Sequence, residues 1–416
     1  MVSEFSNQQS KYKISNPVLW IIYLIAYLSM ELLPSVKYSV PYIIAGLFAM
    51  LPMAIISMRR IEYRIILCIL VVLGFVQGLI TFITGNGAVT ELINEPIRSV
   101  RFFVPCVLFE IVSKMGRKKQ LIVWSVCSFI IGFVIIKTLI AVSTNPMIAR
   151  ILAQGALDDE LMAYRRDNIG GFGFCYAACL TFGMWAFLML KTKLWMRVVS
   201  IGMMIFLVSF ALQVQYMTML LLCIAAFLFT ILFCAKKPTT KILSVGIVLI
   251  CLMFLPIFLR WLASFNVGGE IYGKIMNIAN TLEGNQSLSN STSRVELYKA
   301  ALIDFIKSPL WGTFGSTAVG TSHSTFLGIA AASGLIGLCA YSYGVYKCYD
   351  VTAKNLKILN VKNNYKMIFI VFIILAVVNP VHYIYEISIV LLLYIPLTFL
   401  LFSKDERLSN DEKKNI

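Results

Sequence analysis

The feature that most constrains this chain is the recurrence of long apolar stretches along all of its 416 residues. Most have the roughly 17–25 residues that an α-helix needs to cross a bilayer. The predicted spans are 17–33, 38–58, 63–84, 97–113, 121–142, 171–190, 197–213, 215–234, 242–263, 325–346, 366–379 and 387–402. With 59% apolar and only 13% charged residues, the composition is that of a chain whose solvent is lipid. The predicted fold class is an all-α, polytopic integral membrane protein of about 12 transmembrane helices, forming a single membrane domain over 1–416.

The basic residues test this arrangement. Under the positive-inside rule, short cytoplasmic connections carry the Lys and Arg. Alternate connections here do so, and with both tails that side holds 24 basic and 8 acidic residues, which accounts for the whole formal charge of +16. Both termini are therefore predicted to be cytoplasmic. The charge reflects topology and contact with membrane lipids, so no nucleic-acid partner is expected. The first span has no small-residue cleavage site after it and is expected to be retained.

Two outer loops are long, 143–170 and 264–324, and the second lies between the ninth and tenth spans. An amphipathic helix is predicted within it over 294–308. Ser293 and Glu296 have the spacing of a capping box, and Pro309 is expected to end the helix. Such a helix should lie in the membrane interface with its apolar face down.

Few residues at the outer side could carry chemistry. The only two histidines, His323 and His382, fall at outer ends of spans, and Glu386 stands four residues after His382, where it could orient the imidazole. The other reading of each histidine is an interfacial residue that caps a helix end. Arginine side chains suited to phosphate oxygens stand at the same side, although each could instead snorkel to lipid headgroups: Arg98, Arg101, Arg165, Arg166, Arg260 and Arg294.

Motifs for metal and nucleotide chemistry are absent from the sequence. It contains no Asp-x-Asp, no His/Cys/carboxylate cluster with zinc spacing and no phosphate-binding glycine loop. Neither a metal site nor a cofactor is therefore expected.

Two linked patterns resemble a known family. His323-Ser324, followed after nine residues by Gly334-Leu-Ile-Gly337, resembles the His-[Asn/Ser/Gln]-x9-Gly-x-x-Gly signature of the bacterial O-antigen ligase and O-antigen polymerase superfamily. The upstream stretch 294–312 is similar to that family's Arg…Leu…Ala-Leu…Pro-Leu-x-Gly helix and turn. The similarity covers about 293–338, and elsewhere only the twelve-span layout agrees.

The resemblance implies a metal-independent, GT-C-like membrane glycosyltransferase of the bacterial inner membrane, with its active site facing the periplasm. His323 would deprotonate or orient the acceptor hydroxyl, and Arg294 would hold the diphosphate of the donor. Ser324 and the other outer residues would bind substrate, and Gly334 and Gly337 would allow close helix packing. The family's usual Ser-Arg pair between the seventh and eighth spans is absent. Either Arg98, Arg101 or Arg166 would supply that cation, or this member of the family would bind its donor differently.

Within the family, a polymerase of O-antigen or capsular repeats is favoured, acting on undecaprenyl-diphosphate-linked oligosaccharide. The resemblance leaves room for a chain-length regulator protein as a further partner. The alternative is a ligase that transfers polysaccharide to lipid A-core. An alternative of another class is a lipid-linked oligosaccharide flippase or transporter, which would need charged residues inside the bilayer. The predicted span interiors contain few charges.

Overall fold

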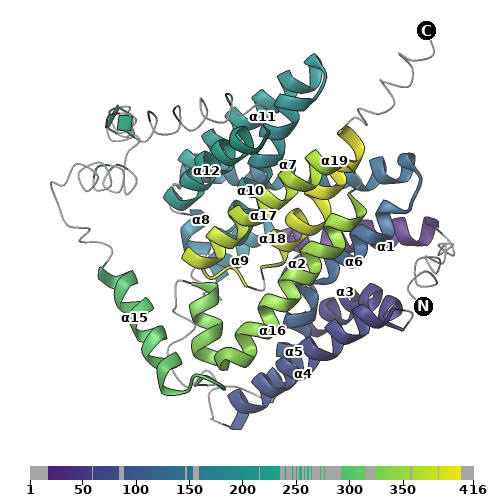
Figure 1. Cartoon of the computed structure of the whole chain (residues 1–416), viewed down its shortest axis with the longest axis vertical. Helices are drawn as coiled ribbons and strands as arrows, with labels where there is room; N and C mark the ends of the chain where they lie inside the picture. The colour runs from purple at the N-terminus through teal and green to yellow at the C-terminus, as the bar shows by residue number, and fades with distance from the viewer. Residues whose placement is uncertain are drawn as a thin grey trace.

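The computed structural model describes residues 17–403, except for 59, 84–88, 146–147, 153–158, 215, 314–323, 357, 383 and most of 235–291. Helices account for 87% of the described residues, and none of these residues lies in a β-strand (Figure 1). Six helical segments in the described part are long and apolar enough to cross a membrane. The chain is therefore an all-α membrane protein, as the sequence predicts.

The helices follow the predicted spans closely. The first part of the chain contains α1 (Pro17–Leu32), α2 (Pro34–Lys37), α3 (Tyr42–Ser57), α4 (Ile61–Ile83), α5 (Glu91–Arg101), α6 (Val104–Ser113), α7 (Arg117–Thr144), α8 (Ile148–Ile151) and α9 (Asp159–Arg166). The second part contains α10 (Phe172–Lys191), α11 (Leu194–Gln213), α12 (Met217–Cys234), α15 (Thr292–Lys307), α16 (Thr325–Asn355), α17 (Leu359–Val378), α18 (Tyr385–Ile389), the π-helical turn η3 (Val390–Tyr394) and α19 (Ile395–Phe402). The predicted span 242–263 lies mostly outside the described residues, and the predicted outer loop 143–170 contains α8 and α9.

One predicted span is wrong in its form. The stretch 97–113 is divided between α5 and α6, with a break at Phe102 and Phe103. Pro105 stands in the first turn of α6, where its missing N–H cannot continue a preceding helix. The short α5 instead packs against α4, so closely that a Cβ at Gly74 would lie 2.6 Å from the Cα of Pro96. This packing holds the charged residues of α5 against the bundle.

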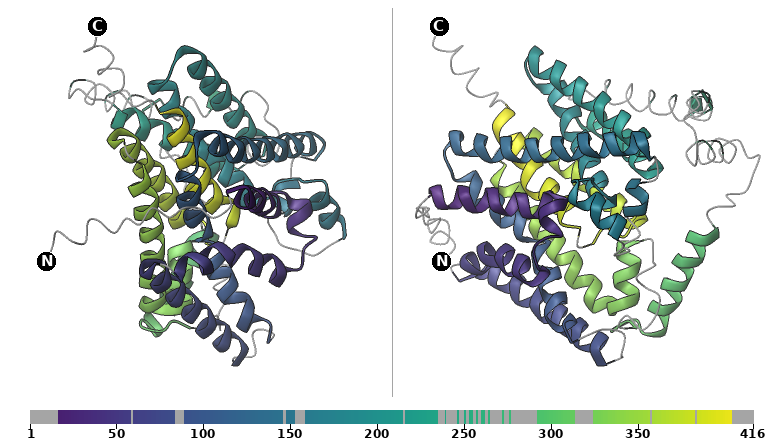
Figure 2. Two further views of the ribbon diagram at one scale, coloured as in Figure 1. Left: turned by 90° about the vertical axis from the view of Figure 1, so that its right-hand side faces the viewer. Right: turned by 180° about the vertical axis from the view of Figure 1, so that it is seen from behind.

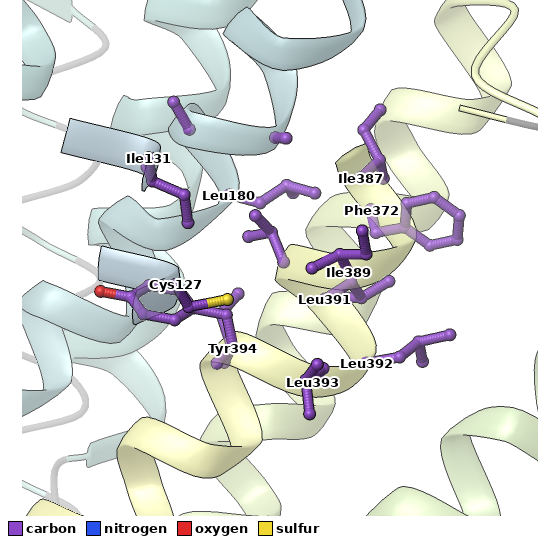
Figure 3. Packing of buried hydrophobic residues seen from close by; sticks show 14 of the residues in the cluster. Cys127, Ile131, Leu180, Phe372, Ile387, Ile389, Leu391, Leu392, Leu393 and Tyr394 are labelled. Atoms are coloured by element: carbon purple, nitrogen blue, oxygen red, sulfur yellow. The ribbon is translucent and has the colours of Figure 1, made fainter. Parts of the chain in front are cut away.

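The C-terminal helices form the centre of the bundle. In α10, and in the continuous unit of α18, η3 and α19, 83% of the residues in the apolar 18-residue stretch are buried. In α11 the corresponding share is 28%. Figure 3 shows the buried side chains of this unit facing Cys127 and Ile131 of α7 and Leu180 of α10. The peripheral helices expose apolar residues such as Phe129 and Val198, as expected of surfaces that face lipid. Among them, α1 lies alongside α7 (Figure 2).

The helix α16 is bent. The backbone of Gly334 is in the left-handed region (φ 61°), which divides α16 into two limbs that form a V in Figure 1. The turn after α15 fills the vertex: Leu335 N–H donates to the Pro309 carbonyl at 2.8 Å, and Thr313 N–H donates to the Ala331 carbonyl at 2.8 Å. The sequence suggested that Gly334 allows close packing of helices, and this is wrong. Gly334 allows the turn and the helix break to meet backbone to backbone.

The amphipathic helix is present, with a shifted start. It begins at Thr292, so Ser293 lies inside its first turn and is not the N-cap. Ala301 is buried on the side that packs against α16, while Leu302, Ile303 and Ile306 are exposed. The helix thus has one face against the protein and a second apolar face available to the membrane interface.

Candidate functional site

The start of α16 meets the loop between α17 and α18. Thr325 donates through both its backbone N–H (3.2 Å) and its hydroxyl (2.9 Å) to the carbonyl of Asn379. The same hydroxyl accepts from the N–H of Val381 at 2.8 Å, so it satisfies two buried backbone groups of the loop. The residue after His323 in the chain, Ser324, is the N-cap of α16 and accepts from the N–H of Leu327 at 3.3 Å. Ser324 therefore has a structural role as the N-cap of α16.

The start of α15 reaches the same place. The hydroxyl of Tyr298 donates to the carbonyl of Val378 at 3.4 Å. Tyr298 stands one helical turn after Arg294, and Val378 is the chain neighbour of Asn379. Thus Tyr298, four residues after Arg294, and Thr325, two residues after His323, contact two consecutive residues at the end of α17. His323 itself, and the side chain of Arg294, lie outside what the structure describes.

His382 lies in the loop between α17 and α18, four residues after Val378. Burial, and secondarily the nearby Arg98 guanidinium, lower its pKa to about 4. The imidazole is therefore neutral at neutral pH and can accept a hydrogen bond. The predicted pairing with Glu386 is wrong, because α18 begins only at Tyr385 and the two residues do not share a helical face. Glu386 instead forms an ion pair with Lys37.

The two arginines of α5 point to acidic partners within the protein. Arg98 forms an ion pair with Glu95, one turn earlier in α5. Arg101 makes a two-pronged contact with Glu31 of α1, with Nε–Oε1 and Nη2–Oε2 distances of 2.6 and 2.9 Å. Both partners are almost fully buried, with 2% and 0% of their side chains exposed. Arg101 therefore holds helices together and is not an open cation for substrate.

Tyr385 lies at the centre of these charged residues. The guanidinium carbon of Arg101 is 4.3 Å from the centre of its ring, a cation–π distance. The Tyr385 hydroxyl oxygen is 2.9 Å from the Tyr42 hydroxyl oxygen. Tyr42 in turn interacts with the guanidinium of Arg98. The first residue of α18 thus connects α3, α5 and the loop that holds His382.

A cavity of about 260 Å3 opens on the other side of α18. Its charged lining residues are Lys37 at the end of α2, Arg165 at the end of α9, and Glu386. The Lys37–Glu386 contact is 2.6 Å long; burial disfavours the charge on Lys37, but the carboxylate outweighs this and raises the pKa of Lys37 above its ordinary value. Arg165 stacks on the Tyr38 ring, with its guanidinium carbon 4.2 Å from the ring centre.

Two predicted arginines are exposed at the protein surface. Arg166 is exposed at the end of α9, and Arg260 is exposed within a stretch of which only isolated residues are described. No three His, Cys, Asp or Glu residues of the described part gather as a metal-binding group.

Three charged residues of the site are not predicted from the sequence: Glu31, Lys37 and Glu95. A signal for them exists. Glu31 and Lys37 stand at the C-terminal end of the first apolar run, where a charge without a partner would be costly. That cost indicates a partner but does not say which residue it is.

A comparison with protein-family models and with curated proteins finds no match for this chain. The candidate site therefore rests on the residues of this chain alone. It consists of the adjoining ends of α15 and α16, the loop after α17, the charged residues around Tyr385, and the cavity beside α18.

Proposed function

We propose that this chain is a membrane glycosyltransferase of the O-antigen polymerase and ligase superfamily, and within it a polymerase of surface polysaccharide. It would have about twelve spans, a GT-C-like architecture and both termini in the cytoplasm of a bacterial host. At the periplasmic face of the inner membrane it would join undecaprenyl-diphosphate-linked repeat units.

One observation supports this proposal most. The two halves of the sequence signature are far apart in the chain, one around Arg294 and one around His323, yet their described neighbours Tyr298 and Thr325 contact Val378 and Asn379. A reaction that needs a base and a cation at one reacting centre requires such an arrangement.

The proposed chemistry is the displacement of diphosphate from a sugar. The acceptor hydroxyl attacks the anomeric carbon of the donor, a C–O bond forms, and the bond to the diphosphate oxygen breaks. His323 takes the hydroxyl proton, and Arg294 stabilises the charge that develops on the diphosphate. The ion-paired Arg98 and the neutral His382 would line the acceptor side.

The proposal is tested with the full-length protein in nanodiscs, supplied with the lipid-linked repeat unit of its host in the presence of EDTA. A ladder of lengthening products is expected, and it should be lost in His323→Ala and Arg294→Ala. Lys299→Ala, an exposed cation on the same helix, is the matched control and should keep the ladder. Transfer only after lipid A-core is added would instead show the ligase.

A transporter is the second candidate, because the bundle contains more charge than its apolar spans suggest. The pairs Arg101–Glu31, Lys37–Glu386 and Arg98–Glu95 all lie at least partly within the protein. Charged residues inside a membrane bundle often mark a transport pathway. Movement of lipid-linked saccharide across sealed vesicles, without any lengthening of it, would favour this candidate.

A further inference from the structure

The cavity beside α18 contains a cation that lacks an acidic partner in the described structure. Arg165 is 94% buried, since only 6% of the residue is exposed. Among the described residues, no carboxylate lies within ion-pairing distance of it, and its polar contact is with the sulfur of Met162 at 3.7 Å. The nearest acid in the lining, Glu386, is already paired with Lys37. A buried charge without a counter-charge is costly, so the site favours an anion from outside the protein.

The charge of the cavity indicates how many negative charges that anion has. Its lining contains two cations, Lys37 and Arg165, and one anion, Glu386, which leaves one positive charge. A single carboxylate neutralises this charge, whereas a diphosphate would bring an excess of negative charge. The planar fork of Arg165 also matches the two oxygens of a carboxylate.

The size and the remaining lining indicate what carries the carboxylate. A volume of about 260 Å3 is enough for one sugar ring and too small for an oligosaccharide. Phe172, and Tyr38 beneath Arg165, offer aromatic surface to the apolar face of a ring. The ammonium of Lys37 and the second oxygen of Glu386 offer a donor and an acceptor for ring hydroxyls.

We propose that this cavity binds one acidic sugar, a uronate of the repeat unit, with its carboxylate on Arg165. The assignment rests on the proposed function for the origin of the sugar, and it names the class of saccharide that the enzyme handles. The cavity lies one residue along α18 from Tyr385, so a sugar bound here lies next to the charged residues around that ring.

The test measures binding alone, on the full-length protein in nanodiscs. Saturation-transfer NMR titrations compare glucuronate, glucose and inorganic phosphate as probes. Glucuronate is expected to bind most tightly, and Arg165→Gln should weaken it about tenfold or more, as expected when a charge-assisted bond is lost. Arg197→Gln, an exposed arginine outside the cavity, should leave the affinity unchanged. Arg165→Lys, which keeps the charge and loses the fork, should fall between the two.

Two results on the wild-type protein overturn the proposal without any variant. One is glucose binding as tightly as glucuronate, and the other is phosphate binding more tightly than glucuronate. These outcomes are separate from those of the transferase assay, because no product is formed. Arg165-dependent glucuronate binding without a product ladder would keep the acidic-sugar site and reject the polymerase; a ladder without glucuronate preference would do the reverse.

Discussion

At the residue scale, the pair of Glu31 and Arg101 has the strongest physical consequence. Moving a carboxylate and a guanidinium out of water costs free energy. Their mutual attraction offsets this cost only when their geometry and hydrogen bonding are good. Here two N–H groups of Arg101 meet the two carboxylate oxygens, and the Tyr385 ring covers the guanidinium. The pair joins α1 to Arg101, the last residue of α5 before the break that precedes α6.

Removing one partner of this pair should be strongly destabilising. Arg101→Met or Glu31→Leu leaves a buried charge without its partner, at a cost of about 3–5 kcal/mol. The double variant, which replaces both charges by apolar side chains, should recover much of this loss. Lys354→Met, which breaks the exposed pair with Asp350, is the control and should cost less than about 1 kcal/mol. Thermal unfolding in detergent measures all four, and equal losses in the single and double variants would contradict the argument.

His382 should make the stability depend on pH. Its pKa is about 4 in the folded protein and roughly 6.5 in an unfolded chain. Between these values the unfolded state binds more protons, so stability falls as the pH falls from about 6.5 to 4. The unfolding temperature of His382→Gln should therefore decline less than that of the wild type over this range. Carboxylates titrate in both proteins, so the difference between the two unfolding temperatures reports on His382 alone. Parallel curves of unfolding temperature against pH would show that His382 is not buried in its neutral form.

At the scale of elements, the contact between the turn after α15 and the bend of α16 fixes how these two helices lie against each other. Two glycines with positive φ, Gly312 and Gly334, stand at this contact. A Cβ at Gly334 would lie 2.3 Å from the carbonyl carbon of Leu310, and backbone cannot yield as a flexible side chain can. Both the conformation and the space at Gly334 therefore require glycine.

Gly334→Ala should separate the turn from the bend and shift the starts of α15 and α16 relative to each other. We expect lower thermal stability and the loss of the proposed transferase activity. Gly132→Ala in α7 is the matched control, because nothing lies within 4 Å of the added carbon and the helix gains from alanine. A fully active Gly334→Ala protein would show that the contact is not needed for the site.

At the scale of the whole molecule, the distribution of basic residues predicts the topology. The helix α7 begins with Arg117, Lys118 and Lys119, while its other end at Thr144 and Asn145 is uncharged. A reporter fused after Gly116 should therefore be cytoplasmic, with fluorescent GFP and inactive alkaline phosphatase, and one fused after Asn145 should give the opposite pair. The same state for both fusions would show that α7 does not cross the membrane.

The sequence by itself determined the class of the protein and the position of most helices. Hydropathy is a local property, so runs such as 121–142 and 171–190 correspond to α7 and α10 without knowledge of their neighbours. It also indicated the amphipathic helix before Pro309, because helical periodicity and a proline are visible in one dimension.

Only the tertiary structure decided the composition of the site. Arg101 pairs with a residue 70 positions away and Lys37 with one 349 positions away, and nothing in the sequence selects these partners. The same holds for Gly334, whose role depends on a turn from another segment. Pairing in a low-dielectric interior is set by which side chains the packing brings together. For this reason the sequence indicated that charges stand at this end of the bundle. The fold decided that Lys37 and Glu386 pair in the cavity, and that Arg165 lines it without an acidic partner among the described residues.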